Sequence, residues 1–536
     1  MQREQYIPTE RFEELDRVDL DTTFEILEIY CRTLLPDLEA CLVFLLRILR
    51  DPDAEKHPKT ATWLPRLVRK AAALGPLDRQ ALGLAHKLTG DPAIGNQLNR
   101  LEQFREDVTR MTIYGSGCSP KSLERNRRKM LPQLERQPGN VPIADLLLLL
   151  DFYQGVEHGA WLEKFSVPEF FREAWTRRLF LHLAGLGAAE PALALWPEIA
   201  QGPVCEVHLN FAAAQYALLG DRDNAIALYR HSLALDPDQG PITLRLAELE
   251  NPTIPDASLT ERHDVTIGIY SWNKADDLEM TLRRLAETNI GRARLRVLLN
   301  GCTDRSAEVC DAARALFPDN DFKVITLPVN VGAPAARNWL GSLPEVRNSE
   351  FLAYLDDDVE LPNDWLAHYL SVMGRFPETS AVGCKIVHSH DPRRIQYLHR
   401  RFTLAQPGII KLTDTNQVGQ MDCGMYDYTC LTETVMGCCH LLRMAHMPEG
   451  PKFDLRYSPS QMDDIAHDLD LRLAGGEVRY CGLVRCIHHQ NSGSFVAREL
   501  TAAQYGQLMG NETKFYFIFK DRIEGIRECM KDARLA

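Results

Sequence analysis

The sequence lacks any hydrophobic run long enough to span a membrane. Its longest apolar stretches, Ala40–Leu46 and Leu146–Leu150, are far shorter than the roughly 18–20 residues that a membrane-spanning helix needs. The segment 1–17 is charged and has no apolar core, which is unlike a secretory signal. We therefore expect no transmembrane segment and a cytoplasmic location.

An excess of positive charge is also missing. The 536 residues include 61 Lys and Arg against 74 Asp and Glu, which gives a formal net charge of −13. A protein that follows the phosphates of a nucleic acid usually carries a basic face or arm, so the composition argues against a nucleic-acid partner. The short basic runs 125–129 and 393–401 are interpreted as solvated or ion-paired surfaces.

The cysteines show neither a zinc motif nor a disulfide framework. None of the 14 forms a CxxC pair, although Cys438 and Cys439 are adjacent. A structural zinc site would need a tighter repeat, and disulfide frameworks belong to small secreted domains. We predict that most of these cysteines are reduced residues of the core.

Residues 1–250 show helical spacing of apolar residues, which predicts an all-α domain. Within them, segment 206–239 carries small or aromatic residues at positions typical of a tetratricopeptide repeat. These are Ala213, Tyr216, Gly220, Ala225, Tyr229, Ser232 and Pro237. Three interpretations stay open: a groove for a protein or peptide, a homodimer surface, and a plain helical scaffold.

The pattern changes after a proline-containing linker at 251–263. Short β-rich runs at 265–270, 295–299, 323–327 and 351–355 alternate with helical stretches. This alternation predicts an α/β domain over 264–498, with a mostly parallel sheet and helices on both faces. Segment 432–444 is predicted to be a further buried strand, and 499–536 a helical tail. A glycosylation sequon at Asn511 is interpreted as accidental.

Three adjacent carboxylates follow the fourth predicted strand. Asp356, Asp357 and Asp358 would repel one another strongly without a cation. Residues i and i+2 of an extended chain point the same way, so Asp356 and Asp358 can face one metal ion. Carboxylate oxygens suit Mg²⁺ or Mn²⁺. The alternative interpretation is an acidic turn before Pro362.

Four motifs occur in order, each after its own predicted strand: YSWNKADD, NGCTD, NVGAPAARN and DDDVELP. This series resembles the family 2 glycosyltransferases of GT-A fold, and the resemblance covers about residues 264–490. It implies a nucleotide-diphosphate sugar donor, expected to be a UDP-sugar, and a divalent cation. One departure concerns the base: Leu299 stands where the family often has an acidic residue that contacts it, so uridine specificity stays open.

The resemblance also implies the roles of individual residues. Those expected at the nucleotide sugar are Tyr270, Ser271, Asn273, Asn300, Asp304, Gly332, Arg337, Asp356 and Asp357. For Arg337 the alternatives are a contact that offsets phosphate charge and a salt bridge that supports the Asp loop. Gly437 matches a small residue near the acceptor.

The catalytic acid pair is expected at Asp463 and Asp464, where the family places a general base at the start of a helix. Asp464 is preferred as the base, and helix capping is the alternative reading of the pair. His488, 24 residues after Asp464, is expected to be the third metal ligand with Asp356 and Asp358, in preference to His489. One carboxylate base and no covalent nucleophile imply inversion at the anomeric carbon.

The predicted function is therefore transfer of a sugar to a hydroxyl of a protein, peptide or glycan acceptor presented by the helical domain. Two alternatives stay open. One is a non-catalytic repeat scaffold with a degenerate transferase domain, for which Leu299 is the best support. The other is a nucleotidyltransferase, which normally has a glycine-rich phosphate loop that YSWNKADD does not provide.

Overall fold

The computed structural model describes residues 15–104, 120–404, 410–412, 421–489 and 502–532. Most of the segment 1–17, the last residues of the predicted domain 264–498 and both ends of the predicted tail 499–536 lie outside these ranges. The chain divides into two compact units. One comprises Met1–Glu250 with Gln417–Met425, and the other Asn251–Asn416 with Tyr426–Ala536.

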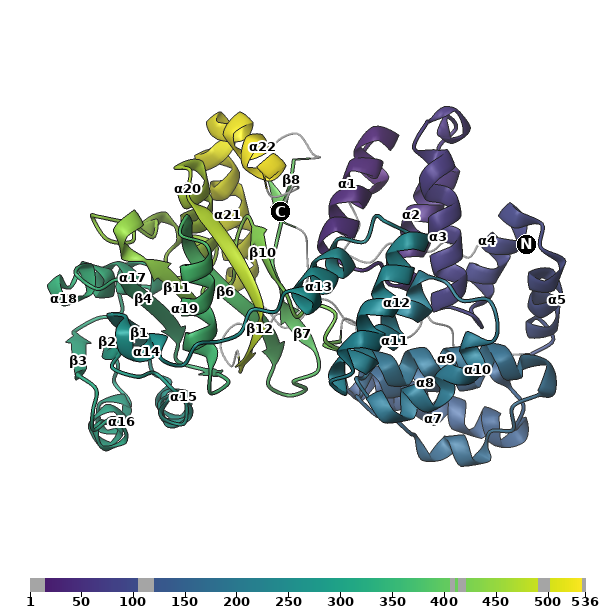
Figure 1. Cartoon of the computed structure of the whole chain (residues 1–536), viewed down its shortest axis with the longest axis horizontal. Helices are drawn as coiled ribbons and strands as arrows, with labels where there is room; N and C mark the ends of the chain where they lie inside the picture. The colour runs from purple at the N-terminus through teal and green to yellow at the C-terminus, as the bar shows by residue number, and fades with distance from the viewer. Residues whose placement is uncertain (1–14, 105–119, 405–409, 413–420, 490–501, 533–536) are drawn as a thin grey trace. The chain divides into compact units, whose positions relative to one another are not determined.

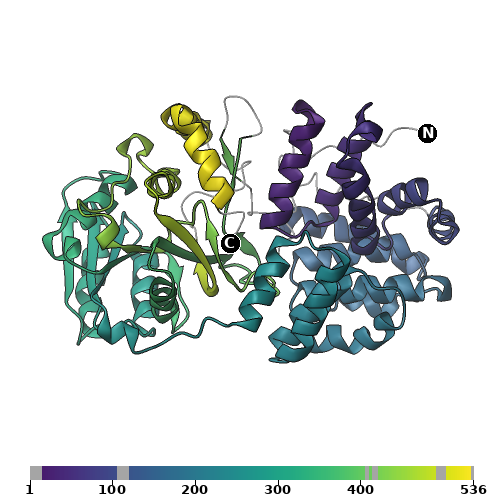
Figure 2. The same ribbon diagram turned by 45° about the horizontal axis from the view of Figure 1, so that its top comes forward.

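The first unit is built from helices, as predicted (Figure 1; Figure 2). The helices are α1 (Leu20–Thr33), α2 (Leu38–Arg50), α3 (Thr60–Leu74), α4 (Arg79–Thr89), α5 (Pro92–Leu101), α7 (Pro120–Arg136), α8 (Val141–Tyr153), α9 (Arg172–Gly185), α10 (Ala189–Ala200), α11 (Glu206–Leu218), α12 (Arg222–Leu235) and α13 (Gly240–Glu250). Several begin at an Asp or Asn whose side chain accepts a backbone N–H of the first turn, as Asp37 does from Ala40.

Helices α11 and α12 form the helix–turn–helix of segment 206–239, with Gly220 in a left-handed conformation between them. Ala213, Ala225, Tyr229 and Ser232 are buried, as residues between two closely packed helices must be. Whether this pair works as a tetratricopeptide repeat stays a prediction.

The second unit is an α/β domain with one large sheet. Its strands follow the order β10-β12-β6-β11-β4-β1-β2-β3. Their bounds are β1 (Val265–Ser271), β2 (Arg294–Asn300), β3 (Phe322–Leu327), β4 (Phe351–Asp356), β6 (Thr379–His388), β10 (Thr429–Thr432), β11 (Cys439–Arg443) and β12 (Glu477–His488), with β5 (Val359–Glu360) on β12 and β7 (Ile395–Tyr397) on β6. The first four predicted strands are confirmed as β1 to β4, which are parallel.

Alternate residues of a strand point to opposite faces of its sheet. Apolar side chains on both faces of this sheet pack against helices. Val297 and Leu299 pack in one cluster with residues of α15 (Ala275–Ala286), α16 (Ser306–Ala313) and α19 (Trp365–Arg375). Leu298 lies in another with residues of α17 (Ala333–Ser342) and α18 (Pro344–Arg347). Figure 1 shows α15 and α16 on one side of β1–β3, and α17 and α18 on the other. The predicted α/β class is confirmed.

Segment 432–444 differs from its prediction as one strand. β10 ends at Thr432 and β11 begins at Cys439, and the residues between them form an irregular connection. Asp468 holds this connection, because its Oδ2 accepts the Val435 N–H at 2.9 Å and the Thr434 hydroxyl at 3.0 Å. Asp468 lies on α20 (Asp463–Leu473), and Asp464 at the start of that helix accepts the Gly437 N–H of the same connection.

Two helices follow the sheet, α21 (Ala502–Phe519) and α22 (Ile523–Asp532), in agreement with the predicted helical tail. Within the described residues, neither these nor any other helix combines the length and apolar character needed to cross a membrane. Eleven of the described cysteines are buried, as expected for residues of the core.

Candidate active site

The carboxyl ends of β4 and β12 bring three predicted metal ligands together. Asp356 is the last residue of β4, Asp358 lies just before β5, and His488 ends β12. β5 pairs with β12 so that His488 lies opposite Val359, next to Asp358. One ligand atom from each of the three residues lies within 4.8 Å of the others. Two carboxylate oxygens and an imidazole nitrogen at this spacing fit a single divalent cation.

The His488 ring has an oxygen partner at each nitrogen. Nδ1 lies 2.8 Å from Oε1 of Gln396 on β7, and Nε2 lies 3.2 Å from Oδ1 of Asp358. The carbonyl acceptor at Nδ1 favours a proton on that nitrogen, so in the neutral ring the Nε2 lone pair is available to a metal. Burial lowers the pKa of His488, but the Asp358 carboxylate outweighs burial and raises it overall. His489 instead bonds to Glu360 through Nε2 at 2.8 Å, so it is His488 that joins the cluster.

Asp356 has a second set of partners on the side of β1. Tyr270 lies opposite Asp356 in the pairing of β1 with β4, and its hydroxyl donates to Asp356 Oδ1 at 2.7 Å. Arg337 Nη2 lies 3.6 Å from the same oxygen. The Arg337 guanidinium also lies 5.2 Å from the Tyr270 ring centre, a cation–π distance.

Arg337 connects this carboxylate to the acid pair. Its Nη1 donates to Asp463 Oδ2 at 2.6 Å, and Nη2 donates to the Gly437 carbonyl at 3.3 Å. Burial raises the pKa of Asp463, while the Arg337 charge acts in the opposite direction. Arg337 therefore makes the kind of salt bridge expected of a residue that supports the Asp loop, and it also pairs with Asp463 of the acid pair.

Asp463 and Asp464 open α20 but have different surroundings. Asp463 is buried against Arg337, whereas Asp464 is half-buried. Asp464 Oδ2 accepts the Gly437 N–H at 2.9 Å. A Cβ at Gly437 would lie 2.8 Å from the Asp464 Cβ, so only glycine allows this approach. Of the pair, Asp464 is the carboxylate that solvent reaches.

The loop before α20 has an unusual backbone. Gln461 and Met462 have φ of 77° and 69°, values that side-chain-bearing residues rarely adopt. The α21 residue Asn511 donates its Nδ2 to the carbonyls of Ser460 at 3.0 Å and Gln461 at 3.2 Å. The Asn511 amide is buried and used in this contact, which agrees with an accidental sequon.

The other residues predicted to contact the nucleotide sugar lie at the carboxyl ends of β1 to β3 or in the loops that follow these strands. Asn300 accepts the Val331 N–H at 2.9 Å and donates to Asn330 at 2.9 Å, and so shapes the approach to Gly332. Gly332 has a φ of 84°. Asp304 accepts the Ala275 N–H at 2.9 Å and thereby caps α15.

The end of β1 and the loop after it carry two further residues that were predicted to contact the nucleotide sugar. Ser271 is buried at the end of β1. Asn273, with a φ of 52°, accepts the Thr303 N–H at 2.7 Å and ties the first loop to the second.

Asp357, the middle residue of the three adjacent aspartates, has an ion-pair partner that was not expected from the sequence. Lys274, which directly follows Asn273, lies 3.2 Å from Asp357 Oδ1 and 2.9 Å from Asp358 Oδ2. Burial raises the pKa of Asp357 to about 7 despite the neighbouring ammonium. Burial also acts to raise the pKa of Asp358, but His488 and Lys274 together lower it below its usual value.

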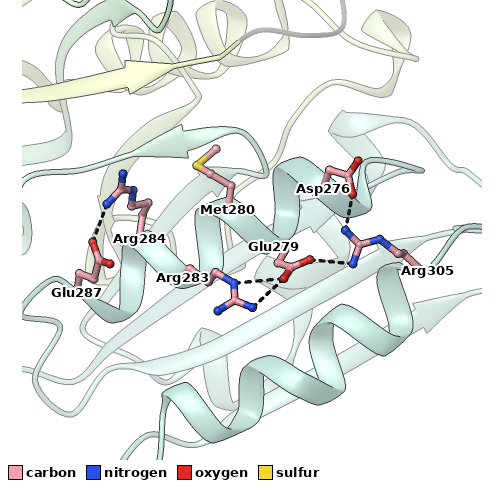
Figure 3. Close-up of a pocket in the computed structure, with 7 residues that line it drawn as sticks. All are labelled: Asp276, Glu279, Met280, Arg283, Arg284, Glu287 and Arg305. Carbon is pink, nitrogen blue, oxygen red and sulfur yellow. Dashed lines mark hydrogen bonds and ion pairs between the residues drawn. The ribbon is translucent and has the colours of Figure 1, made fainter.

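A surface hollow on α15 does not belong to this site. It is lined by Asp276, Glu279, Met280, Arg283, Arg284, Glu287 and Arg305, none of which is a predicted site residue. Figure 3 shows that these charges pair with one another, as Arg305 does with Asp276 and Glu279. Such mutual pairing is typical of a solvated helix surface.

Residues 266–441 match the family described as glycosyl transferase family 2. The match ends before Asp463, Asp464 and His488, so their assignment depends on the geometry above. A comparison with curated proteins gives no match.

Several solved glycosyltransferases are similar in structure at low identity. Staphylococcus aureus TarS is 13% identical (TM-score 0.30), with 41% of this chain and 36% of that chain covered. The mannosyltransferase of Pyrobaculum calidifontis, solved with GDP-Man and Mn²⁺, is 16% identical (TM-score 0.34, 61% and 87% covered). GalNAc-T7, solved with UDP, GalNAc and Mn²⁺, is 12% identical (TM-score 0.34, 49% and 51% covered). This chain thus spans about a third of TarS and half of GalNAc-T7.

Proposed function

We propose that this chain is an inverting, metal-dependent glycosyltransferase that moves a sugar from a nucleotide-diphosphate donor to an acceptor hydroxyl. The observation that carries the proposal is the convergence of Asp356, Asp358 and His488 within 4.8 Å, in a domain that matches family 2. The donor set and the fixed Nε2 of His488 fit a divalent cation, Mn²⁺ or Mg²⁺. When bound, such an ion offsets negative charge on the departing nucleoside diphosphate.

Asp464 is the proposed general base. Asp463 is buried and its Oδ2 is paired with Arg337, whereas Asp464 is half-buried beside Gly437. The base removes the proton of the acceptor hydroxyl as that oxygen attacks the anomeric carbon and the donor's C1–O bond breaks. No covalent enzyme–sugar intermediate is involved, so the configuration inverts.

Replacing this base should slow sugar transfer without affecting the metal. We expect Asp464→Asn to lower the transfer rate about 10²–10⁴-fold, because asparagine cannot accept the proton. Mn²⁺ affinity should be unchanged in the same protein. Asp470→Asn is a matched control, because Asp470 lies on α20 but pairs at the surface with Arg522. Near-normal transfer by Asp464→Asn would refute the assignment.

The donor residues are proposed to act through the loops that they shape. Tyr270 lies near the end of β1 and Asn273 in the loop after it, while Asn300 ends β2 and Gly332 precedes α17. Together they are proposed to form the border of the donor site. Arg337 is proposed to join Asp356 to Asp463, because its guanidinium is buried between them. The base of the donor stays open, with a UDP-sugar as the first to test.

The helical unit is proposed to recognise the acceptor. Its α11–α12 pair supports a protein, peptide or glycan acceptor held on a repeat-like surface, with a homodimer as the alternative use of the same helices. Light scattering of the full chain separates the two, because only the dimer changes the mass in solution.

The decisive experiment is a panel of nucleotide sugars incubated with the full chain and Mn²⁺ or a chelator. Metal-dependent release of sugar from one donor supports the glycosyltransferase and names the sugar. Exchange of pyrophosphate into the donor would instead indicate a nucleotidyltransferase. If neither reaction occurs with any donor while a peptide binds tightly, the chain is an interaction scaffold.

A further inference from the structure

Lys274 lies between β1 and α15 and reaches into the acidic cluster. Its Nζ is 2.9 Å from Asp358 Oδ2 and 3.2 Å from Asp357 Oδ1, and its side chain is 20% exposed. It is the ion-pair partner that the structure gives to Asp357, which is buried. A buried carboxylate without such a partner is costly, so Lys274 allows three adjacent aspartates to fold together here.

The two oxygens of Asp358 have different partners. Oδ1 lies 3.2 Å from His488 Nε2, and Oδ2 lies 2.9 Å from Lys274 Nζ. Because both oxygens are engaged, the carboxylate cannot rotate without breaking a contact. The ammonium thus holds one oxygen away from the cluster and directs the other toward His488. This is the arrangement that binding of a metal through a single oxygen requires.

We propose that Lys274 is a positioning residue of the metal site, which fixes the Asp358 carboxylate with Oδ1 toward His488 and neutralises the adjacent Asp357. The inference rests on the proposed metal-dependent function, since it concerns how the cluster is arranged before a cation binds. A competing role is that the ammonium occupies the place of the cation and must be displaced by it.

The two roles have opposite consequences for metal affinity. Removing a positive charge raises the electrostatic attraction of the site for a cation, so a competing Lys274 would give tighter binding when it is lost. If Lys274 positions Asp358, its loss should weaken metal binding, because replacing a residue that orients a metal ligand typically lowers metal affinity 10–100-fold.

The test is calorimetric titration of Mn²⁺ into the full chain without any donor. For Lys274→Met, which keeps the length of the side chain, we expect Mn²⁺ to bind about 10–100-fold more weakly than to the wild type. The matched control is Lys323→Met, because Lys323 is an exposed lysine on β3. Unchanged or tighter binding by Lys274→Met would overturn the inference.

A second pair of variants separates orientation from charge. Asp357→Asn removes the carboxylate that Lys274 neutralises, so Lys274→Met/Asp357→Asn should regain the thermal stability of Asp357→Asn. Its Mn²⁺ affinity should stay low, because Asp358 is still not oriented. Full recovery of Mn²⁺ binding in the double variant would refute the proposal that Lys274 orients Asp358. The same pair is used if Lys274→Met alone fails to fold.

The titration also distinguishes this inference from the proposed function. If the wild type does not bind Mn²⁺, the metal site itself is wrong. If the wild type binds Mn²⁺ and Lys274→Met binds it equally well, only the role of Lys274 is wrong.

Discussion

At the scale of single residues, the orientation of His488 depends on one amide. Gln396 on β7 is buried, and its Oε1 lies 2.8 Å from His488 Nδ1. We expect Gln396→Leu, which keeps the volume but removes the acceptor, to weaken Mn²⁺ binding about 10–100-fold, because the ring and its tautomer are no longer fixed. Titration with Mn²⁺ measures this, with the exposed Gln201→Leu as control. Equal affinity in the two variants would mean that the amide does not hold the ring.

The sequence singled out the three residues of this cluster as proposed metal ligands, but not the residues that contact them. Asp356, Asp358 and His488 follow strands whose apolar runs are visible, and the order of the motifs implied their roles. Gln396 and Lys274 meet their partners across 92 and 84 residues of sequence. A single polar side chain near a strand has no periodicity, so such a pairing becomes visible only when the sheet is formed.

At the scale of secondary-structure elements, α21 supports the loop that leads into the proposed base. Asn511 donates to the carbonyls of Ser460 and Gln461, next to two residues with left-handed backbone. Left-handed conformations of such residues cost about 1–2 kcal/mol each and persist only when neighbours hold them. The helical tail is thus part of the support of Asp464.

Loss of this support should reduce transfer more than it reduces metal binding. We expect Asn511→Leu to destabilise the protein by about 1–3 kcal/mol, because the hydrogen bonds from the buried Asn511 amide to the Ser460 and Gln461 carbonyls are lost. The transfer rate should fall while Mn²⁺ affinity stays at the wild-type value, since the metal ligands lie on other elements. Asn348→Leu, at an exposed position directly after α18, serves as control. A parallel loss of Mn²⁺ binding would show that the effect is global.

The elements themselves were predictable to different degrees. β1 to β4 follow from short apolar runs bounded by polar loops, and the structure has them almost residue for residue. Segment 432–444 has the same apolar character, yet it divides at an irregular connection. The cause is tertiary, because Asp468 and Asp464 accept the N–H groups of Val435 and Gly437 that a strand would have used. The contact between α21 and the loop had no signal in the sequence for the same reason.

At the scale of the whole molecule, each unit has apolar clusters of its own. Two clusters are formed by buried residues between 73 and 212, and two others by buried residues between 265 and 486. Each unit also holds a buried neutral histidine, His182 in the first and His399 in the second. Burial, with a nearby arginine in each case, lowers the pKa of both to about 3. These two histidines report on the stability of each unit separately.

The sign of their effect follows from proton uptake on unfolding. Below about pH 6.5 the unfolded chain protonates each histidine while the folded chain does not, so stability falls as the pH falls toward 3. Each histidine contributes about 1.4 kcal/mol per pH unit in this window. Scanning calorimetry from pH 7 to 4 should show two transitions. His182→Gln should flatten the pH dependence of one and His399→Gln that of the other. If both variants change the same transition, the two units unfold together and do not have separate stabilities.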